Sequence, residues 1–240
     1  MLFDVLFATA SLIAGAVASV AGFGIGSILT PLLAVRVGTR IAVAAVSIPH
    51  VCGTAVRFWL LRGHLDRRTF VWFGLASAGG GLVGALLHGL ASNRALSIVF
   101  GCLLLFVAAS QLTGLLDRVR FGRTAAWLAG ALSGMFGGLV GNQGGIRSAA
   151  LLAFGLEKQA FVATATAVGL LVDGARLPVY ILTESEDLVR IAPLIALSVL
   201  FVIAGTVIGS RVLKQVPERQ FRIVVAVLLL ALGSWMLLRG

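Results

Sequence analysis

Long apolar runs separated by short charged clusters dominate this chain, and this pattern restricts the folds it can adopt. Most of the runs are about 17 to 24 residues long, the length of one helix across a hydrocarbon core of ~30 Å. Of the 240 residues, 59% are hydrophobic and 12% are charged, with a mean hydropathy of +1.06. A water-soluble fold of this length cannot bury so much apolar surface. The runs lie at 2–35, 41–61, 69–90, 95–116, 124–156, 159–182, 191–210 and 221–238. The sequence therefore predicts an all-α polytopic membrane protein.

The net charge of +10 comes from arginines clustered between the apolar runs, as in loops that set membrane orientation. This distribution argues against nucleic acid as a partner. The first run lacks a basic leading region and is expected to stay in the membrane domain. Cys52 and Cys102 lie inside apolar segments, without disulfide or metal-ligand spacing. No Ser/His/Asp set or phosphate-binding loop is present, so we expect neither an enzyme nor a resident cofactor.

The first and fifth runs are too long for one crossing, and a cluster of glycines interrupts each of them. The order of one long run and three short ones occurs twice, which indicates an internal repeat. Sliding the second half back by 119 positions places Gly134 on Gly15, and an offset of 125 places Gly205 on Gly80. The sequence predicts two repeats, 1–117 and 118–240. Each is expected to be a glycine-broken helical hairpin followed by three transmembrane helices.

Charge asymmetry predicts how these repeats lie in the membrane. The arginine-rich segments after the second run, in the central linker and before the last run are expected in the cytoplasm. The acidic 183–190 loop and the 91–94 loop are expected outside. Each long run must then cross an even number of times, as two short helices or as a re-entrant hairpin. The two repeats therefore have inverted topology and the N-terminus lies outside, although this arrangement also places Arg36 and Arg40 outside.

The glycine clusters are the candidate binding elements. Several glycines together favour a helix break, and the helix that restarts presents free N–H groups and the positive end of its dipole. In a membrane such groups must face protein or a polar cavity, where an anion is favoured. The substrate-binding candidates are Gly24, Gly26, Ser27, Thr30, Asn142, Gln143, Gly144, Gly145 and Arg147. The alternative is close helix packing, which we expect for Gly80, Gly84, Gly205 and Gly209.

Charged residues inside the apolar runs are the other candidates. Arg147 is kept there at a cost of roughly 2.5–3.5 kcal/mol, which favours a substrate or partner over a side chain that snorkels to water. The offset of 119 places Arg176 on Arg57, and both are candidates for anion guidance. The alternative is that their side chains snorkel to water. His50 and Asp173 are candidates for proton coupling, although Asp173 can instead pair with Arg176 three residues on.

The chain resembles the TauE/SafE family of sulfite exporters, also called TSUP or DUF81, over essentially its whole length. The resemblance rests on paired glycine-rich segments in which a G-x-G-G-G pattern is followed by proline. The segment from Gly22 to Leu32 has Ile25 in place of one glycine. The segment from Gly141 to Leu151 has Gln143 in place of a glycine and Ala150 in place of the proline.

This resemblance implies secondary transport of a sulfur oxyanion or organosulfonate such as sulfite, with protons as a plausible driving ion. The residues alone indicate only a small anionic substrate, surrounding membrane lipid and a multi-pass protein, which we expect in the bacterial inner membrane. A passive anion channel and an accessory membrane subunit remain alternatives.

Overall fold

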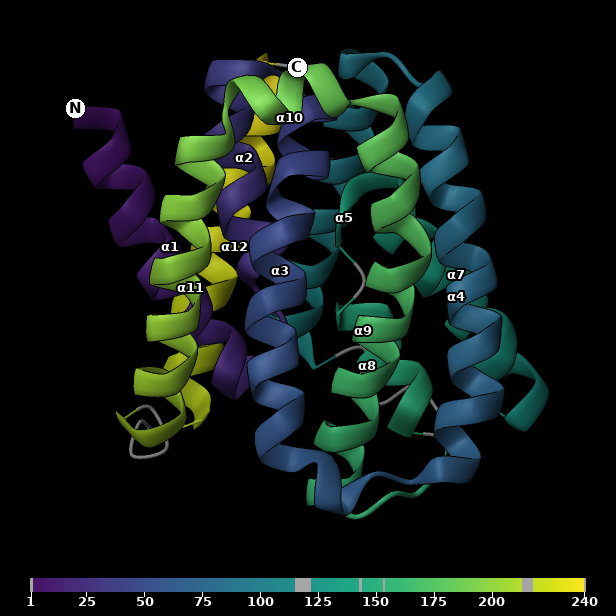
Figure 1. Ribbon diagram of the computed structural model, residues 1–240. Helices are drawn as coiled ribbons and strands as arrows, with labels where there is room; N and C mark the ends of the chain where they lie inside the picture. The colour runs from purple at the N-terminus through teal and green to yellow at the C-terminus, as the bar shows by residue number, and fades with distance from the viewer. Residues whose placement is uncertain (1, 115–121, 143, 153, 213–217, 240) are drawn as a thin grey trace.

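The computed structural model describes residues 2–114, 122–142, 144–152, 154–212 and 218–239, and within these ranges it contains helices and no strands (Figure 1). The helices are α1 (Leu2–Ala21), α2 (Ile25–Val37), α3 (Thr39–Leu61), α4 (Arg67–Leu90), α5 (Asn93–Thr113), α7 (Arg123–Val140), α8 (Gly144–Leu152), α9 (Lys158–Thr183), α10 (Ser185–Arg190), α11 (Ala192–Val212) and α12 (Glu218–Arg239). A short 3-10 helix, η1 (Arg62–His64), follows α3. The predicted all-helical class is confirmed.

Six of the described helices are long and apolar enough to cross a bilayer, namely α1, α3 with η1, α4, α5, α9 and α11. Apolar side chains cover both their inner and their outer faces. Leu29, Ala44 and Val202 belong to one buried core cluster, whereas Val83 and Leu86 project from the outer face of α4. A membrane solvates such an outer face, whereas water does not. The protein is therefore a multi-pass membrane protein, as predicted.

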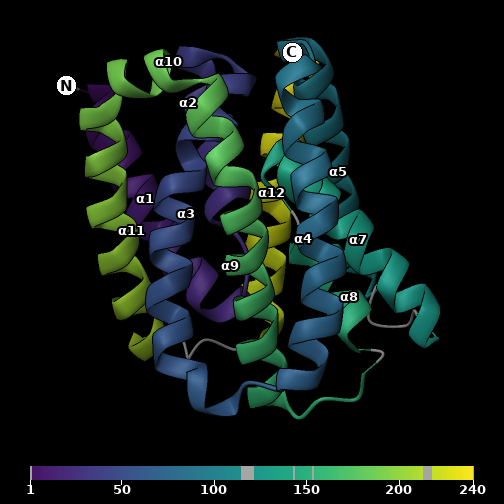
Figure 2. The same ribbon diagram turned by 45° about the vertical axis from the view of Figure 1, so that its right-hand side comes forward.

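Both long apolar runs are broken into a pair of helices at the predicted glycines. Gly22 and Gly24 separate α1 from α2 with φ angles of 79° and 134°, and Gly141 ends α7 with a φ of 76°. Residues with a Cβ rarely adopt such angles. In Figures 1 and 2, α1 runs from the N-terminus into the molecule and α2 leads back to the same end, while α7 and α8 reach in from the opposite end.

The second helix of each pair is short. With 13 residues, α2 rises about 20 Å, and α8 with 9 residues rises about 14 Å. Neither spans a hydrocarbon core of ~30 Å. Each is therefore too short to cross such a layer alone, and whether the pair forms a re-entrant hairpin stays a prediction.

Contacts between the two halves follow the offsets found in the sequence. A Cβ on Gly15 of α1 would meet the Val202 carbonyl of α11, and a Cβ on Gly134 of α7 would meet the Ser77 carbonyl of α4. An advance of 119 positions carries Gly15 to Gly134, and an advance of 125 carries Ser77 to Val202. The two helix pairs thus use corresponding residues. The predicted division between 117 and 118 falls outside the described residues, and the inverted orientation in a membrane stays a prediction.

Close packing at the other paired glycines is confirmed. A Cβ on Gly80 or Gly84 would meet backbone atoms of α7, and a Cβ on Gly205 or Gly209 would meet backbone atoms of α1. Glycine at these positions allows the helix backbones to approach directly.

Exposed charged side chains lie mostly near the ends of the helices. At the end of the molecule that holds the N-terminus, arginines pair with carboxylates: Arg36 with Asp4 at 3.2 Å, Arg40 with Glu184 at 2.6 Å and Arg190 with Asp187 at 3.0 Å. The loop expected at 183–190 is instead largely helical, because α10 begins directly after α9. Of the expected cytoplasmic charges, Arg118, Arg120 and Lys214 lie outside the described residues.

At the opposite end, Asp66 caps α4. Its carboxylate accepts the backbone N–H of Thr69 at 2.7 Å, and this hydrogen bond lowers the pKa of Asp66 below its usual value.

Candidate functional site

A band of polar side chains crosses the interior between α3 and α9, two helices that contact each other. The members on each helix are three, four or seven residues apart, which places them on one face. They are Ser47, His50, Thr54 and Arg57 on α3, and Thr166, Asp173, Arg176 and Tyr180 on α9. Sequence reasoning picked out only the charged residues and His50 among them.

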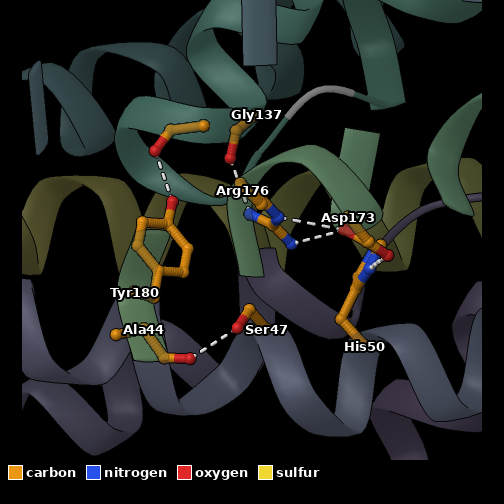
Figure 3. A network of polar contacts seen from close by, with 8 residues as sticks. Ala44, Ser47, His50, Gly137, Asp173, Arg176 and Tyr180 are labelled. Carbon is orange, nitrogen blue, oxygen red and sulfur yellow. Dashed lines mark hydrogen bonds and ion pairs between the residues drawn. The ribbon is translucent and has the colours of Figure 1, made fainter. Parts of the chain in front are cut away.

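A continuous chain of polar contacts joins His50, Asp173 and Arg176 (Figure 3). Nδ1 of His50 lies 2.7 Å from one Asp173 carboxylate oxygen, and the Arg176 guanidinium donates to the other at 2.8 and 3.0 Å. The Asp173 side chain is fully buried. The predicted pair of Asp173 and Arg176 therefore exists, and the same carboxylate also holds His50. A role of His50 and Asp173 in proton coupling stays a prediction.

Arg57 and Arg176 make matching contacts with the ends of the broken helices. Arg176 donates from Nη1 to the Gly137 carbonyl in the last turn of α7 at 2.6 Å, and Arg57 donates from Nη1 to the Ala18 carbonyl in the last turn of α1. Gly137 lies 119 positions after Ala18, the same offset that joins the two arginines. A guanidinium at a helix C-terminus is favoured because the helix dipole is negative there.

These contacts exclude the snorkelling interpretation for both arginines. Only 5% of Arg57 and 1% of Arg176 is exposed. Arg57 also donates from Nε to the Thr166 hydroxyl on α9 at 3.1 Å, so it links three helices. Tyr180 donates its hydroxyl hydrogen to the Gly138 carbonyl, beside the carbonyl that Arg176 binds.

The two glycine breaks meet each other inside the molecule. A Cβ on Gly26 would lie 2.5 Å from the Gly141 carbonyl oxygen, and a Cβ on Gly144 would overlap Phe23. The structure thus brings the two predicted binding elements together, although they are far apart in the sequence.

The helices α2 and α8 both start at this meeting point. Gly24 precedes α2 without a side-chain cap, and the first helical hydrogen bond there runs from Ile28 to Gly24. The N–H groups of Gly26 and Ser27 precede that bond, at the positive end of the dipole. Ser27, Thr30 and Asn142 are buried, Gly144 and Gly145 open α8, and Gln143 lies outside the described residues.

Arg147 is the buried charge that protein groups satisfy least. It lies on α8 with 3% of its surface exposed, and neither Nε nor Nη1 has a hydrogen-bond partner in the described part of the chain. Its Nη1 approaches α9 so closely that a Cβ on Gly169 would be 3.0 Å away. It interacts electrostatically with Arg57, Asp173 and Arg176. Arg147 therefore does not snorkel to water.

Other polar atoms near the breaks also have no hydrogen-bond partner within the described ranges. They are Nδ2 of Asn142 and the hydroxyl oxygens of Thr30 and Thr54. A buried donor without an acceptor costs about 1–3 kcal/mol. Unsatisfied donors and an incompletely hydrogen-bonded guanidinium suit an anion with several acceptor oxygens.

We also looked for a metal site and for a second anion site. Within the described ranges no three His, Cys, Asp or Glu side chains gather as metal ligands, and Cys52 and Cys102 are unpaired thiols. A groove of about 610 Å³ between α3, α10 and α11 is lined by apolar residues such as Ile48, Leu188 and Ile195. Because Ser185 is the one polar side chain among its lining residues, this groove is unsuited to an anion.

Comparison with known proteins supports a transport role. Searches of curated proteins and of solved structures found no match. The family model of the sulfite exporter TauE/SafE family matches residues 7–236, nearly the full length of the chain. With the glycine breaks and the buried cationic site in place, the chain belongs to the sulfite exporter TauE/SafE family.

Proposed function

We propose that the protein is a secondary transporter that moves a small anion across the bacterial inner membrane, and that the anion binds where the two glycine breaks meet. The substrate class is a sulfur oxyanion or organosulfonate such as sulfite. The family match supports a membrane transporter that handles such anions. The choice of substrate within that class, and the membrane concerned, are part of the proposal.

The observation that carries the proposal is the state of Arg147. Two of its guanidinium nitrogens are buried without hydrogen-bond partners among the described residues, which is costly, and a protein keeps such a group when another charge comes to meet it. Asn142 and the starts of α2 and α8 add neutral donors at the same place. Arg147 supplies charge, and these groups orient the anion.

Access to the site requires movement, because the donors around Arg147 are buried. The broken helices are the natural moving parts, since α1–α2 and α7–α8 reach in from opposite ends (Figure 2). Displacing one pair at a time would open the site to one side of the membrane and then to the other. Transporters with inverted repeats commonly work in this way.

Proton coupling would act through His50 and Asp173. The side chain of His50 remains 12% exposed, whereas Asp173 is fully buried between His50 and Arg176. Movement of α9 relative to α3 would separate this pair and change the affinity of both groups for a proton. Transport that responds to a pH gradient in the wild type and not in His50→Gln supports this part of the proposal. An equal response in both proteins overturns it.

The decisive experiment is transport by purified protein in proteoliposomes. Vesicles are loaded in turn with labelled sulfite, thiosulfate, sulfoacetate and lactate, and trans-acceleration by unlabelled anion distinguishes a carrier from a channel. We expect saturable movement of a sulfur oxyanion, and its loss in Arg147→Ala although that variant still inserts and purifies. Arg190→Ala is the matched control, because the Arg190 side chain is 75% exposed at the end of the molecule.

Other results would change the conclusion. Normal transport by Arg147→Ala would remove the site assignment. If folded wild-type protein moved none of the anions, an accessory role would be favoured over a transporter.

A further inference from the structure

The two arginines that cap the broken helices have different neighbours. The offset that places Arg176 on Arg57 also places Asp173 on Thr54. Both arginines donate to the corresponding carbonyl, Gly137 or Ala18. Arg176, however, has a carboxylate three residues before it on the same helix face, whereas Arg57 has only the Thr54 hydroxyl. The repeat therefore supplies an anionic group beside one arginine and omits it beside the other.

Two contacts between α3 and α9 fix where Thr54 lies against α9. His50 contacts Asp173, and Arg57, seven residues later on α3, contacts Thr166, seven residues earlier on α9. The helices are thus antiparallel, and Thr54 faces the turn of α9 that contains Gly169. Nη1 of Arg147 also lies close to Gly169.

The groups at this turn lack acceptors. The hydroxyl of Thr54 is buried without a hydrogen-bond partner among the described residues, as are Nε and Nη1 of Arg147. Arg57 donates hydrogen bonds to the Ala18 carbonyl and the Thr166 hydroxyl, and it has no carboxylate partner in the described ranges. The position that corresponds to the Asp173 carboxylate is therefore surrounded by donors.

Charge at this centre is also unbalanced. Arg57, Arg147 and Arg176 carry three positive charges, and Asp173 carries one negative charge. With His50 neutral, two positive charges remain without a counter-charge. Glu184, the other buried carboxylate in the described chain, is held by Arg40 on the side of the N-terminus. Net charge in a low-dielectric interior is costly, so the ligand that best fits this centre carries two negative charges.

We infer that the transported anion is a dianion, and that one of its oxyanion groups binds between Thr54, Arg57 and Arg147, in the place that the Asp173 carboxylate takes beside Arg176. This inference rests on the proposed function and adds to it both a charge class and a new contact residue. A monoanion bound there leaves one buried guanidinium uncompensated.

A pair of anions of similar size tests the charge class. Thiosulfate and methanesulfonate both have a tetrahedral sulfur, but thiosulfate carries two charges and methanesulfonate carries one. Wild-type protein in proteoliposomes should prefer thiosulfate by at least about tenfold, because the second charge pairs with a buried guanidinium. A wild type that moves both anions without preferring thiosulfate overturns the inference but leaves the transporter intact. A wild type that moves no anion contradicts the proposed function itself.

Thr54→Asp tests the position. The new carboxylate supplies the negative charge that the repeat omits, so thiosulfate should lose its advantage over methanesulfonate by at least about tenfold. Thr54→Asn is the matched control, because it has the size of aspartate without the charge and should keep the preference. Thr54→Asp that retains the wild-type preference overturns the assignment of Thr54.

Thermal unfolding in detergent decides the case in which Thr54→Asp does not transport at all. Without ligand, Thr54→Asp should unfold at a higher temperature than Thr54→Asn, because its carboxylate neutralises a buried guanidinium. Thiosulfate should raise the unfolding temperature of Thr54→Asn and not that of Thr54→Asp. Equal stabilisation of the two variants by thiosulfate would contradict the inference.

Discussion

Three buried arginines surround the meeting point of the broken helices, and they differ in what holds them. Arg176 is matched by the Asp173 carboxylate and the Gly137 carbonyl, and Arg57 by the Ala18 carbonyl and the Thr166 hydroxyl. Arg147 has two nitrogens without a hydrogen-bond partner among the residues that the structure describes. Among the described residues, Arg176 therefore has a carboxylate partner, whereas Arg57 has only neutral acceptors and Arg147 keeps unused donors.

Removing Arg176 should destabilise the protein far more than removing Arg147. Arg176→Ala leaves Asp173 buried beside His50 alone, and breaking a buried ion pair costs about 3–5 kcal/mol in the free energy of unfolding. Arg147→Ala removes a charge with unsatisfied donors and should leave that free energy unchanged or raise it. Thermal and denaturant unfolding of the purified variants in detergent measure the difference. Equal destabilisation by the two substitutions would show that Arg147 is structural as well.

The charged members of the site could be predicted because an arginine or aspartate is conspicuous inside an apolar run. Thr54, Thr166 and Tyr180 could not, since hydroxyl side chains are common in membrane helices and often bond their own backbone. Thr166, for example, also donates to the Val162 carbonyl one turn earlier. The spacing from His50 and Arg57 and the repeat offset were the available signals for Thr54.

At the scale of helices, paired glycines determine how closely the elements approach. Contacts between α4 and α7 rest on Gly80 and Gly84, and those between α1 and α11 rest on Gly205 and Gly209. These helix pairs join one half of the chain to the other. Their spacing therefore controls how the broken helix pairs α1–α2 and α7–α8 pack against the remaining helices.

Gly84→Ala should separate α4 from α7, because its Cβ would overlap the Met135 carbonyl. Overpacking of this kind costs about 1–3 kcal/mol in the free energy of unfolding. Gly79→Ala is the matched control on the same helix, since a Cβ there has no atom within 4 Å. It should be neutral or stabilise α4 by up to about 1 kcal/mol through helix propensity. Comparable unfolding temperatures for the two variants would contradict the packing role of Gly84.

The helices and their breaks were largely predictable, because the length of an apolar run indicates a helix and a glycine cluster indicates a break. Two features were not. Helix α10 occupies an expected loop, since six residues are too short to produce a hydrophobic signal. The meeting of Gly26 with Gly141 depends on how distant helices pack, which no local pattern reveals.

At the scale of the whole molecule, the two ends differ in how their arginines are compensated. Arg36, Arg40 and Arg190, at the end with α10, each pair with a carboxylate. Arginines usually lie on the cytoplasmic side, so Arg36 and Arg40 are unexpected outside. Their pairing with carboxylates offsets this positive charge. At the opposite end, the segment from η1 to the start of α4 carries Arg62, Arg67 and Arg68 within seven residues of sequence, 62–68. Such a cluster is typical of a cytoplasmic surface.

This difference predicts the orientation in the cell. After Cys52 and Cys102 are replaced by alanine, Ser185→Cys places a thiol on α10, and Gly63→Cys places one on η1, where a Cβ has no atom within 4 Å. A membrane-impermeant maleimide should label Ser185→Cys in intact cells and Gly63→Cys only after the membrane is permeabilised. The reverse pattern would place both termini in the cytoplasm, because the N- and C-terminal ends lie at the same end of the molecule as α10 (Figure 1). The α1–α2 hairpin would then open towards the cytoplasm, and each proposed access route would lead to the other side of the membrane.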